Sequence, residues 1–219
     1  MDVTCLGHSC FRIKGKEVTL ITDPYSEALG YDWPGPAANI VTVSHGHQGH
    51  EGSSRVDGGP KVLRRPGEYE IREVFITGLP SFHDGEHGAV RGKNVIFLIR
   101  MEEVTFCHLG DLGHLPSSRQ VEEMSETDVL FVPVGGVSTT DVGMASQIVR
   151  MLNPSLVIPM HYGTEVVTWL EPVDKFLKEM GLREILPQPR LSVTKSNLPA
   201  ATQVSLLAYP GQPLEPLAG

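Results

Sequence analysis

Three histidines lie within six residues of this chain, at His45, His47 and His50. The apolar run 40–43 directly precedes them, so the sequence predicts a buried strand that ends in a His-x-His-x-x-His loop. In extended backbone, residues two apart point to the same side, which brings His45 and His47 together. Glycines inside the loop allow the tight turn that His50 needs. Imidazoles that converge at the end of a strand suit Zn, Fe or Mn, so we expect a metal site here.

Three further candidate ligands follow other apolar runs of the chain: His83, Asp111 and His161. Taken alone, a His or Asp at the end of a strand is more often a loop residue that forms a hydrogen bond. The alternative for the first loop is an exposed histidine-rich segment. The combination of residues is more specific, because open α/β sheets place their ligand sites at the carboxyl ends of strands.

The elements that must position these residues are mostly short β-strands rich in Val, Ile, Thr and Phe. We predict strands over 2–5, 10–13, 17–22, 39–44, 61–64, 69–78, 94–100, 104–109, 129–133, 156–160, 191–194 and 204–208. Helices are predicted over 141–152 and 172–180, with a weaker one over 118–125. Many strands come first and β–α alternation follows, which indicates an α/β protein with layers around more than one sheet.

The composition is that of an ordinary globular protein, with 40% apolar and 20% charged residues among 219. A net charge of −8 argues against general nucleic-acid binding. The sequence holds no apolar run long enough to span a bilayer and no signal-peptide pattern at its start, so we expect a cytoplasmic protein without a membrane partner. Cys5, Cys10 and Cys107 lack C-x-x-C spacing and are expected to be free and buried.

These motifs, taken in order, resemble the metallo-β-lactamase superfamily, and within it the branch that contains the L-ascorbate-6-phosphate lactonase and many Zn-dependent hydrolases. The resemblance covers roughly residues 2–208. It is carried by the stretches 7–11 (GHSCF), 22–24 (TDP), 45–50 (HGHQGH), 66–71 (PGEYEI), 109–111 (LGD) and 159–163 (PMHYG), together with His83.

The resemblance implies a fold and a set of ligands. The fold would be an αβ/βα four-layer sandwich, two β-sheets flanked by helices, as a single domain over 1–208 with a loose tail over 209–219. Carried over residue by residue, the first metal would be held by His45, His47 and His83 and the second by His50 and His161. Asp111 would bridge both ions, and Asp111 and His161 would be the catalytic residues.

One position departs from the family's pattern. The family's loop has an aspartate where this chain has Gly49. That carboxylate binds the second metal and orients water in the family, so we expect a weakened second site and reduced turnover. Asp84 and Glu68 are the nearest carboxylates in sequence that could replace it.

Three residues are expected to support the ligands or line the pocket. Asp23 would be a buried carboxylate that braces the histidine loop. His108, three residues before Asp111, is predicted either to orient a ligand or simply to be part of the core. His8 is a candidate pocket residue. Two basic pairs near predicted strand ends, Arg64-Arg65 and Arg91-Lys93, are equally well explained as solvated surface.

The expected function is hydrolysis by a metal-activated water, with Zn in one or two sites and Mn or Fe as alternatives. The substrate would be a small, preferably anionic lactone, ester or phosphoester. Two other classes stay open: a non-catalytic metal-binding or ligand-sensing protein, and a mononuclear iron oxygenase-like enzyme. A homo-oligomer is compatible with the sequence.

Overall fold

The first of two β-sheets contains the N-terminal strands. The structure, a computed structural model, describes residues 1–212. The strand order is β12-β1-β2-β3-β4-β5. The strands are β1 (Asp2–Gly7), β2 (Cys10–Lys14), β3 (Thr19–Thr22), β4 (Ile40–Thr42), β5 (Lys61–Leu63) and β12 (Leu191–Ser192). The pairs from β12 to β3 are antiparallel, whereas β3, β4 and β5 are parallel.

The second sheet has the order β13-β11-β10-β9-β8-β7-β6. Its strands are β6 (Gly67–Ile71), β7 (Val74–Phe82), β8 (Lys93–Met101), β9 (Val104–His108), β10 (Val129–Pro133), β11 (Leu156–Met160) and β13 (Gln203–Val204). Strands β6 to β9 form an antiparallel meander, and β9, β10, β11 and β13 are parallel. Every residue of β10 and β11 is buried, as expected of parallel strands covered on both faces.

Two predicted strands differ most from the structure. Of the run 204–208 only Val204 lies in a strand, β13. The run 69–78 contains the end of β6 and the start of β7, joined by a two-residue turn at Arg72 and Glu73. Both turn residues have positive φ, 49° and 63°, as a type I′ hairpin requires. Such turns usually contain Gly, Asn or Asp. Arg and Glu give no turn signal, so the sequence pattern merged two strands into one.

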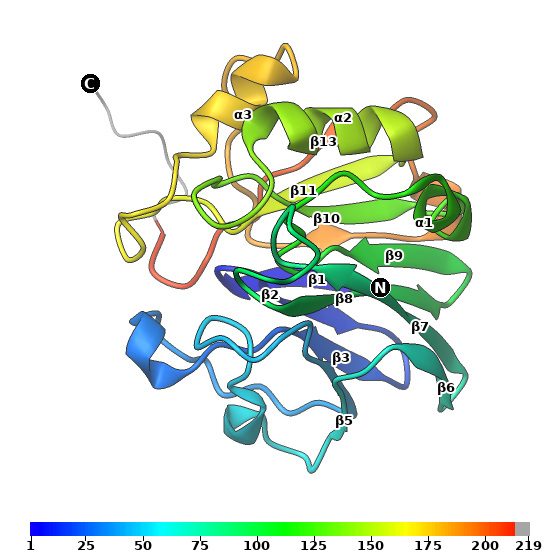
Figure 1. The fold of residues 1–219 in the computed structure, drawn as a ribbon. Helices are drawn as coiled ribbons and strands as arrows, with labels where there is room; N and C mark the ends of the chain where they lie inside the picture. The colour runs from blue at the N-terminus through cyan, green and yellow to red at the C-terminus, as the bar shows by residue number, and fades with distance from the viewer. Residues whose placement is uncertain (213–219) are drawn as a thin grey trace.

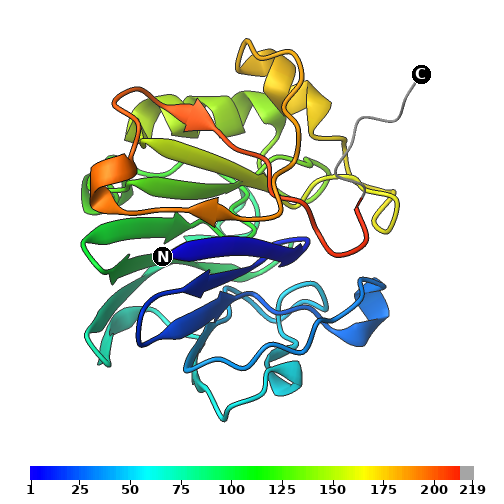
Figure 2. The same ribbon diagram turned by 180° about the vertical axis from the view of Figure 1, so that it is seen from behind.

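The two sheets pack face to face, and the layers outside them differ (Figures 1 and 2). Helices α1 (Ser118–Glu123), α2 (Val142–Leu152) and α3 (Asp174–Glu179) lie on the side of the second sheet. Loops and the short 3-10 helices η1 (Glu27–Leu29) and η2 (Ser53–Arg55) lie beside the first sheet, and η3 (Lys195–Asn197) precedes β13. This is the α/β class with two sheets and flanking helices that the sequence predicts. None of the helices described here has the length and apolar character needed to cross a bilayer.

Three groups of buried apolar side chains hold these layers together. One lies between the sheets and includes Phe11, Phe97 and Phe131. A second joins β9, β10 and β11 to α2 and α3, and a third lies under the loops of the first sheet. The three cysteines are free and buried, as predicted. Of the expected loose tail, Tyr209 places its ring 5.4 Å from that of Tyr31, whereas 213–219 lie outside the described residues.

Candidate metal centre

One buried carboxylate, Asp111, lies at the centre of four imidazoles. Its Oδ2 is 3.1 Å from Nε2 of His83, 3.2 Å from that of His161 and 3.6 Å from that of His45. Its Oδ1 is 3.2 Å from Nε2 of His50. The loops that follow β4, β7, β9 and β11 supply these residues, so the fold brings together side chains that are up to 116 positions apart (161 − 45).

The first group of histidines consists of His45, His47 and His83. One ring nitrogen of each lies within 4.8 Å of the others. The ring centroids are 4.6 to 4.9 Å apart. His45 and His83 are buried, whereas His47 is exposed at the mouth of the cleft. The structure thus brings together the three residues that the family resemblance assigns to a first metal.

The second group consists of His8, His50 and His161. Its ring nitrogens also lie within 4.8 Å of one another, and all three residues are buried. The His8 ring is 4.2 Å from that of His161 and 5.3 Å from that of His50. His8 comes from the turn between β1 and β2, and its carbonyl accepts a 3.3 Å hydrogen bond from the main-chain N–H of His161. Sequence reasoning placed His8 in the pocket and did not count it among the ligands.

Asp23 supports the histidine loop from behind. It is completely buried at the end of β3, and its Oδ1 accepts a 2.7 Å hydrogen bond from the main-chain N–H of Ser44. Its Oδ2 accepts from the Ser44 hydroxyl and lies 2.8 Å from Nδ1 of His50. When Nδ1 of His50 donates to Asp23, its Nε2 is the nitrogen left to bind an ion beside Asp111, and such carboxylate partners fix the orientation of metal ligands. Asp23 also lies in a third cluster, with His45 and His50.

His108 is occupied by main-chain bonds. Its Nε2 donates to the carbonyl of Ser9 at 2.9 Å, and its Nδ1 accepts from the N–H of Gly110 at 3.2 Å. The ring also contacts Phe11 and Phe131. Because both nitrogens are engaged, His108 joins the loop that carries Asp111 to the β1–β2 turn.

The histidines of the cluster differ in the direction in which their pKa values are shifted. Burial, followed by the neighbouring His50, lowers the pKa of His45 to about 3. Burial also acts to lower the pKa of His50, but the carboxylates of Asp111 and Asp23 raise it to about 10. Burial raises the pKa of Asp111, and the facing His161 and His50 outweigh it and hold that pKa well below its ordinary value.

The polar atoms of the cluster fit a metal ion. Nε2 of His45 and Oδ1 of Asp111 are buried and make no hydrogen bond, although buried polar atoms in proteins almost always do. Imidazole nitrogen and carboxylate oxygen are the donors that zinc and related ions take in protein sites. The described residues therefore offer a donor set suited to transition metals, centred on Asp111.

A cleft of about 520 Å³ opens onto the cluster. Besides the histidines, its lining includes Leu29, Val90, Arg91, Ser138 and Trp169. The Trp169 side chain is 60% exposed. Arg91 is the one Lys or Arg in this lining, and its Nη2 donates to the carbonyl of Val137 at 3.3 Å. The cleft therefore has a metal-binding floor and a rim with one cation and several apolar surfaces.

Neither nearby carboxylate replaces the aspartate missing at position 49. The two oxygens of Asp84 accept four main-chain N–H bonds from Glu86, Gly88, Val90 and Arg91. Asp84 thus shapes the loop that presents Arg91.

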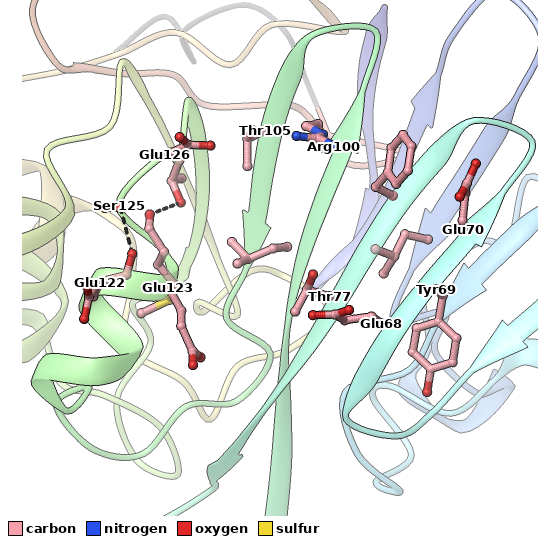
Figure 3. Close-up of a pocket in the computed structure, with 15 residues that line it drawn as sticks. Glu68, Tyr69, Glu70, Thr77, Arg100, Thr105, Glu122, Glu123, Ser125 and Glu126 are labelled. Atoms are coloured by element: carbon pink, nitrogen blue, oxygen red, sulfur yellow. Dashed lines mark hydrogen bonds between the residues drawn. The ribbon is translucent and has the colours of Figure 1, made fainter.

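Glu68 lies in a different cavity, a groove of about 650 Å³ alongside β7 and β8 (Figure 3). The carboxylates labelled there come from β6 and from the region of α1: Glu68, Glu70, Glu122, Glu123 and Glu126. No histidine lines this groove, so it does not share the donor set of the cluster.

Comparisons with known proteins cover most of the chain. A family model described as "Beta-lactamase superfamily domain" matches residues 2–161, a span that includes every histidine of both groups. The crystal structure of a proposed Zn-dependent hydrolase of the metallo-beta-lactamase superfamily from Thermotoga maritima is 37% identical, with a TM-score of 0.79, over 94% of this chain and 97% of that one. A metal-dependent hydrolase from Methanopyrus kandleri is 27% identical over 218 residues, 83% of this chain and 94% of the relative. CmlA, a diiron beta-hydroxylase from Streptomyces venezuelae, shares the fold at 16% identity and a TM-score of 0.63, over 88% of this chain and 54% of that one.

Proposed function

Because the chain belongs to the metallo-β-lactamase superfamily, we propose that it is a metal-dependent hydrolase with its reaction centre around Asp111. The observation that carries this proposal is the set of four buried imidazole nitrogens within 3.6 Å of one carboxylate. We propose zinc as the ion, because the donors are mostly imidazoles with one shared carboxylate. Relatives from other organisms carry the name metal-dependent hydrolase.

A metal ion held there supplies a Lewis acid and lowers the pKa of a water molecule toward neutrality. The protein's own residues do the rest. Asp111 presents Oδ1 to His50 and Oδ2 to His83 and His161, and its charge would balance part of the positive charge of an ion. Asp23 holds the His50 ring in one orientation through Nδ1. His161, on the wall between Asp111 and the cleft, contributes its Nε2 to the centre and is 5% exposed.

The lining of the cleft supports a small anionic substrate. Arg91 offers a guanidinium at the rim, and Val90 and Trp169 offer exposed apolar surface beside it. A lactone, ester or phosphoester with one anionic substituent could place that substituent near Arg91 while the scissile group faces Asp111. The resemblance to the L-ascorbate-6-phosphate lactonase branch favours phosphorylated sugar lactones as the first probes.

The test combines metal analysis with a substrate screen. Protein purified without chelator is expected to hold at least about one equivalent of transition metal, as specific sites do. It should hydrolyse a lactone, ester or phosphoester probe, lose that activity after dialysis against a chelator and regain it with zinc. Failure to bind any transition metal on titration would contradict the proposal at its base.

The glycine at position 49 favours one other candidate, a metal-binding or ligand-sensing protein without turnover. Metal at full occupancy together with no hydrolysis of anionic or neutral probes would select this alternative. Thermal-shift measurements with the same probes would then identify a ligand, because a molecule that binds only the folded state raises the unfolding temperature.

A further inference from the structure

We infer that His8 is a ligand of the second metal ion and supplies a donor next to Gly49, where this chain lacks a carboxylate side chain. The inference rests on the proposed metal centre but not on hydrolysis. It replaces the expectation of a weak second site with a complete one, formed by His8, His50, His161 and the shared Asp111.

The His8 ring is placed where a metal ligand is needed. Its side chain faces the cleft over the metal-binding floor, and its ring nitrogen lies within 4.8 Å of those of His50 and His161. The residue is only 9% exposed, and its buried Nδ1 makes no hydrogen bond. A buried, unpartnered imidazole beside two others suits ligation better than packing, because packing alone would leave that nitrogen unsatisfied.

His8 lies directly beside Gly49. A Cβ on residue 49 would lie 3.0 Å from both Cδ2 and Nε2 of His8, so the ring would have to shift by a few tenths of an ångström to admit one. The absence of a side chain at position 49 thus leaves the His8 ring room on this side of the second site.

The backbone of the β1–β2 turn fixes the place of the His8 ring. His8 has φ of 55°, and His161 has φ of 51°, in the left-handed region that residues other than glycine adopt less often. The bond from the His161 N–H to the His8 carbonyl joins these two residues. The main chain therefore sets the direction in which both rings leave the backbone.

A second site with His8 and without a carboxylate at position 49 has a nitrogen-rich donor set. Both sites now consist of three imidazoles and a share of Asp111, and the second carries one negative charge fewer than an aspartate would give it. Nitrogen-rich sites favour Zn, Co and Ni over Mn and Mg, which prefer carboxylate oxygen. The second site is therefore expected to select the same ion as the first.

The test compares His8→Asn with His87→Asn. Asparagine tolerates positive φ, and His87 is a matched control, since it is exposed and has the same φ of 55°. Metal content after dialysis, and competition with a chromophoric chelator, would be measured for zinc. The wild type and His87→Asn should hold about two equivalents, and His8→Asn about one, with affinity for the second ion reduced at least about tenfold.

The outcomes separate the two proposals. If the wild type binds no metal, both fail. If the wild type and His8→Asn each bind two ions with equal affinity, or the wild type binds only one, the role of His8 is refuted while a metal-dependent function stands.

A measurement on the wild type covers the case in which His8→Asn does not fold. Diffraction at the zinc edge from zinc-loaded crystals locates both ions. A nitrogen of His8 at about 2.0–2.1 Å from the second ion supports the inference, and a distance beyond about 3 Å overturns it.

Discussion

The two histidine groups around Asp111 are built in different ways. His45, His47 and His83 have ordinary backbone conformations, and His47 is exposed. In the second group all residues are buried, and His8 and His161 have left-handed backbone. In the first group, which lies at the open end of the cleft, side-chain conformations alone bring the rings together. In the second group, left-handed main chain at His8 and His161 directs the rings toward one another.

This difference indicates which part of the site is organised before any metal arrives. Left-handed backbone costs roughly 1–2 kcal/mol for each residue with a Cβ, and folding meets that cost without help from the ion. His50 is fixed as well, through its 2.8 Å bond to Asp23. His47 has no such support. The second group is therefore preorganised, whereas the first gains part of its order on binding.

The largest effect is expected from Asp111→Asn, because Asp111 is the one residue shared by both groups. The amide keeps the shape of the side chain but removes the charge that faces four imidazoles. Affinity for both ions should fall at least about 100-fold, and any hydrolysis should be lost with it. Zinc competition titration measures this, with Asp174→Asn, at an exposed carboxylate on α3, as a control outside the centre. Retention of either ion at wild-type affinity would show that the groups do not depend on a common carboxylate.

Asp23→Asn should distinguish the groups, since Asp23 contacts His50 directly and touches no ring of the first group in a direct hydrogen bond. Loss of the carboxylate that orients His50 is expected to weaken the second ion about 10–100-fold and leave the first within a few-fold. The same change should lower the free energy of unfolding by about 1–3 kcal/mol, because a buried acceptor is altered. Equal weakening of both ions would mean that Asp23 acts on the whole loop instead.

The metal-free protein should show the preorganisation of His50 as a pH dependence. Its pKa is raised from 6.5 to about 10 in the folded state. A raised folded-state pKa gives stability that is fully present below pH 6.5 and is lost as the pH rises through about 10. The unfolding temperature should therefore fall by about 3 °C or more between those limits. The Asp23→Asn variant should lose much of this slope, and a flat profile in the wild type would contradict the assignment.

The smallest effect is expected from Arg91→Gln, which lies outside both groups. Its guanidinium is exposed at the rim, so its loss should leave metal content unchanged. For an anionic ester we expect KM to rise about two- to fivefold, in line with an exposed charge contact. A matched neutral ester should show no change. If the two esters respond alike, Arg91 does not select for charge.

The sequence predicts the members of the centre better than its arrangement. Residues at strand ends, such as His45, Asp111 and His161, were candidate ligands because parallel strands end at one edge of a sheet. His8 was harder to assign, because it lies in a turn between antiparallel strands, where a polar residue is unremarkable. Its closeness to Gly49 depends on how two loops meet, and local sequence carries no signal for that. The turn at Arg72 and Glu73 was missed for a different reason, because neither residue is a usual turn former.

Both histidine groups draw ligands from the two sheets: His8 and His50 follow strands of the first sheet, and His161 follows a strand of the second. Each ion would therefore link the two sheets across their interface. When the free metal concentration is 100 times the dissociation constant of a site, binding there adds about 2.7 kcal/mol to the free energy of unfolding. We expect the cellular lifetime of this protein to follow the metal supply. Molecules made when metal is scarce should unfold more often and be degraded by proteases sooner.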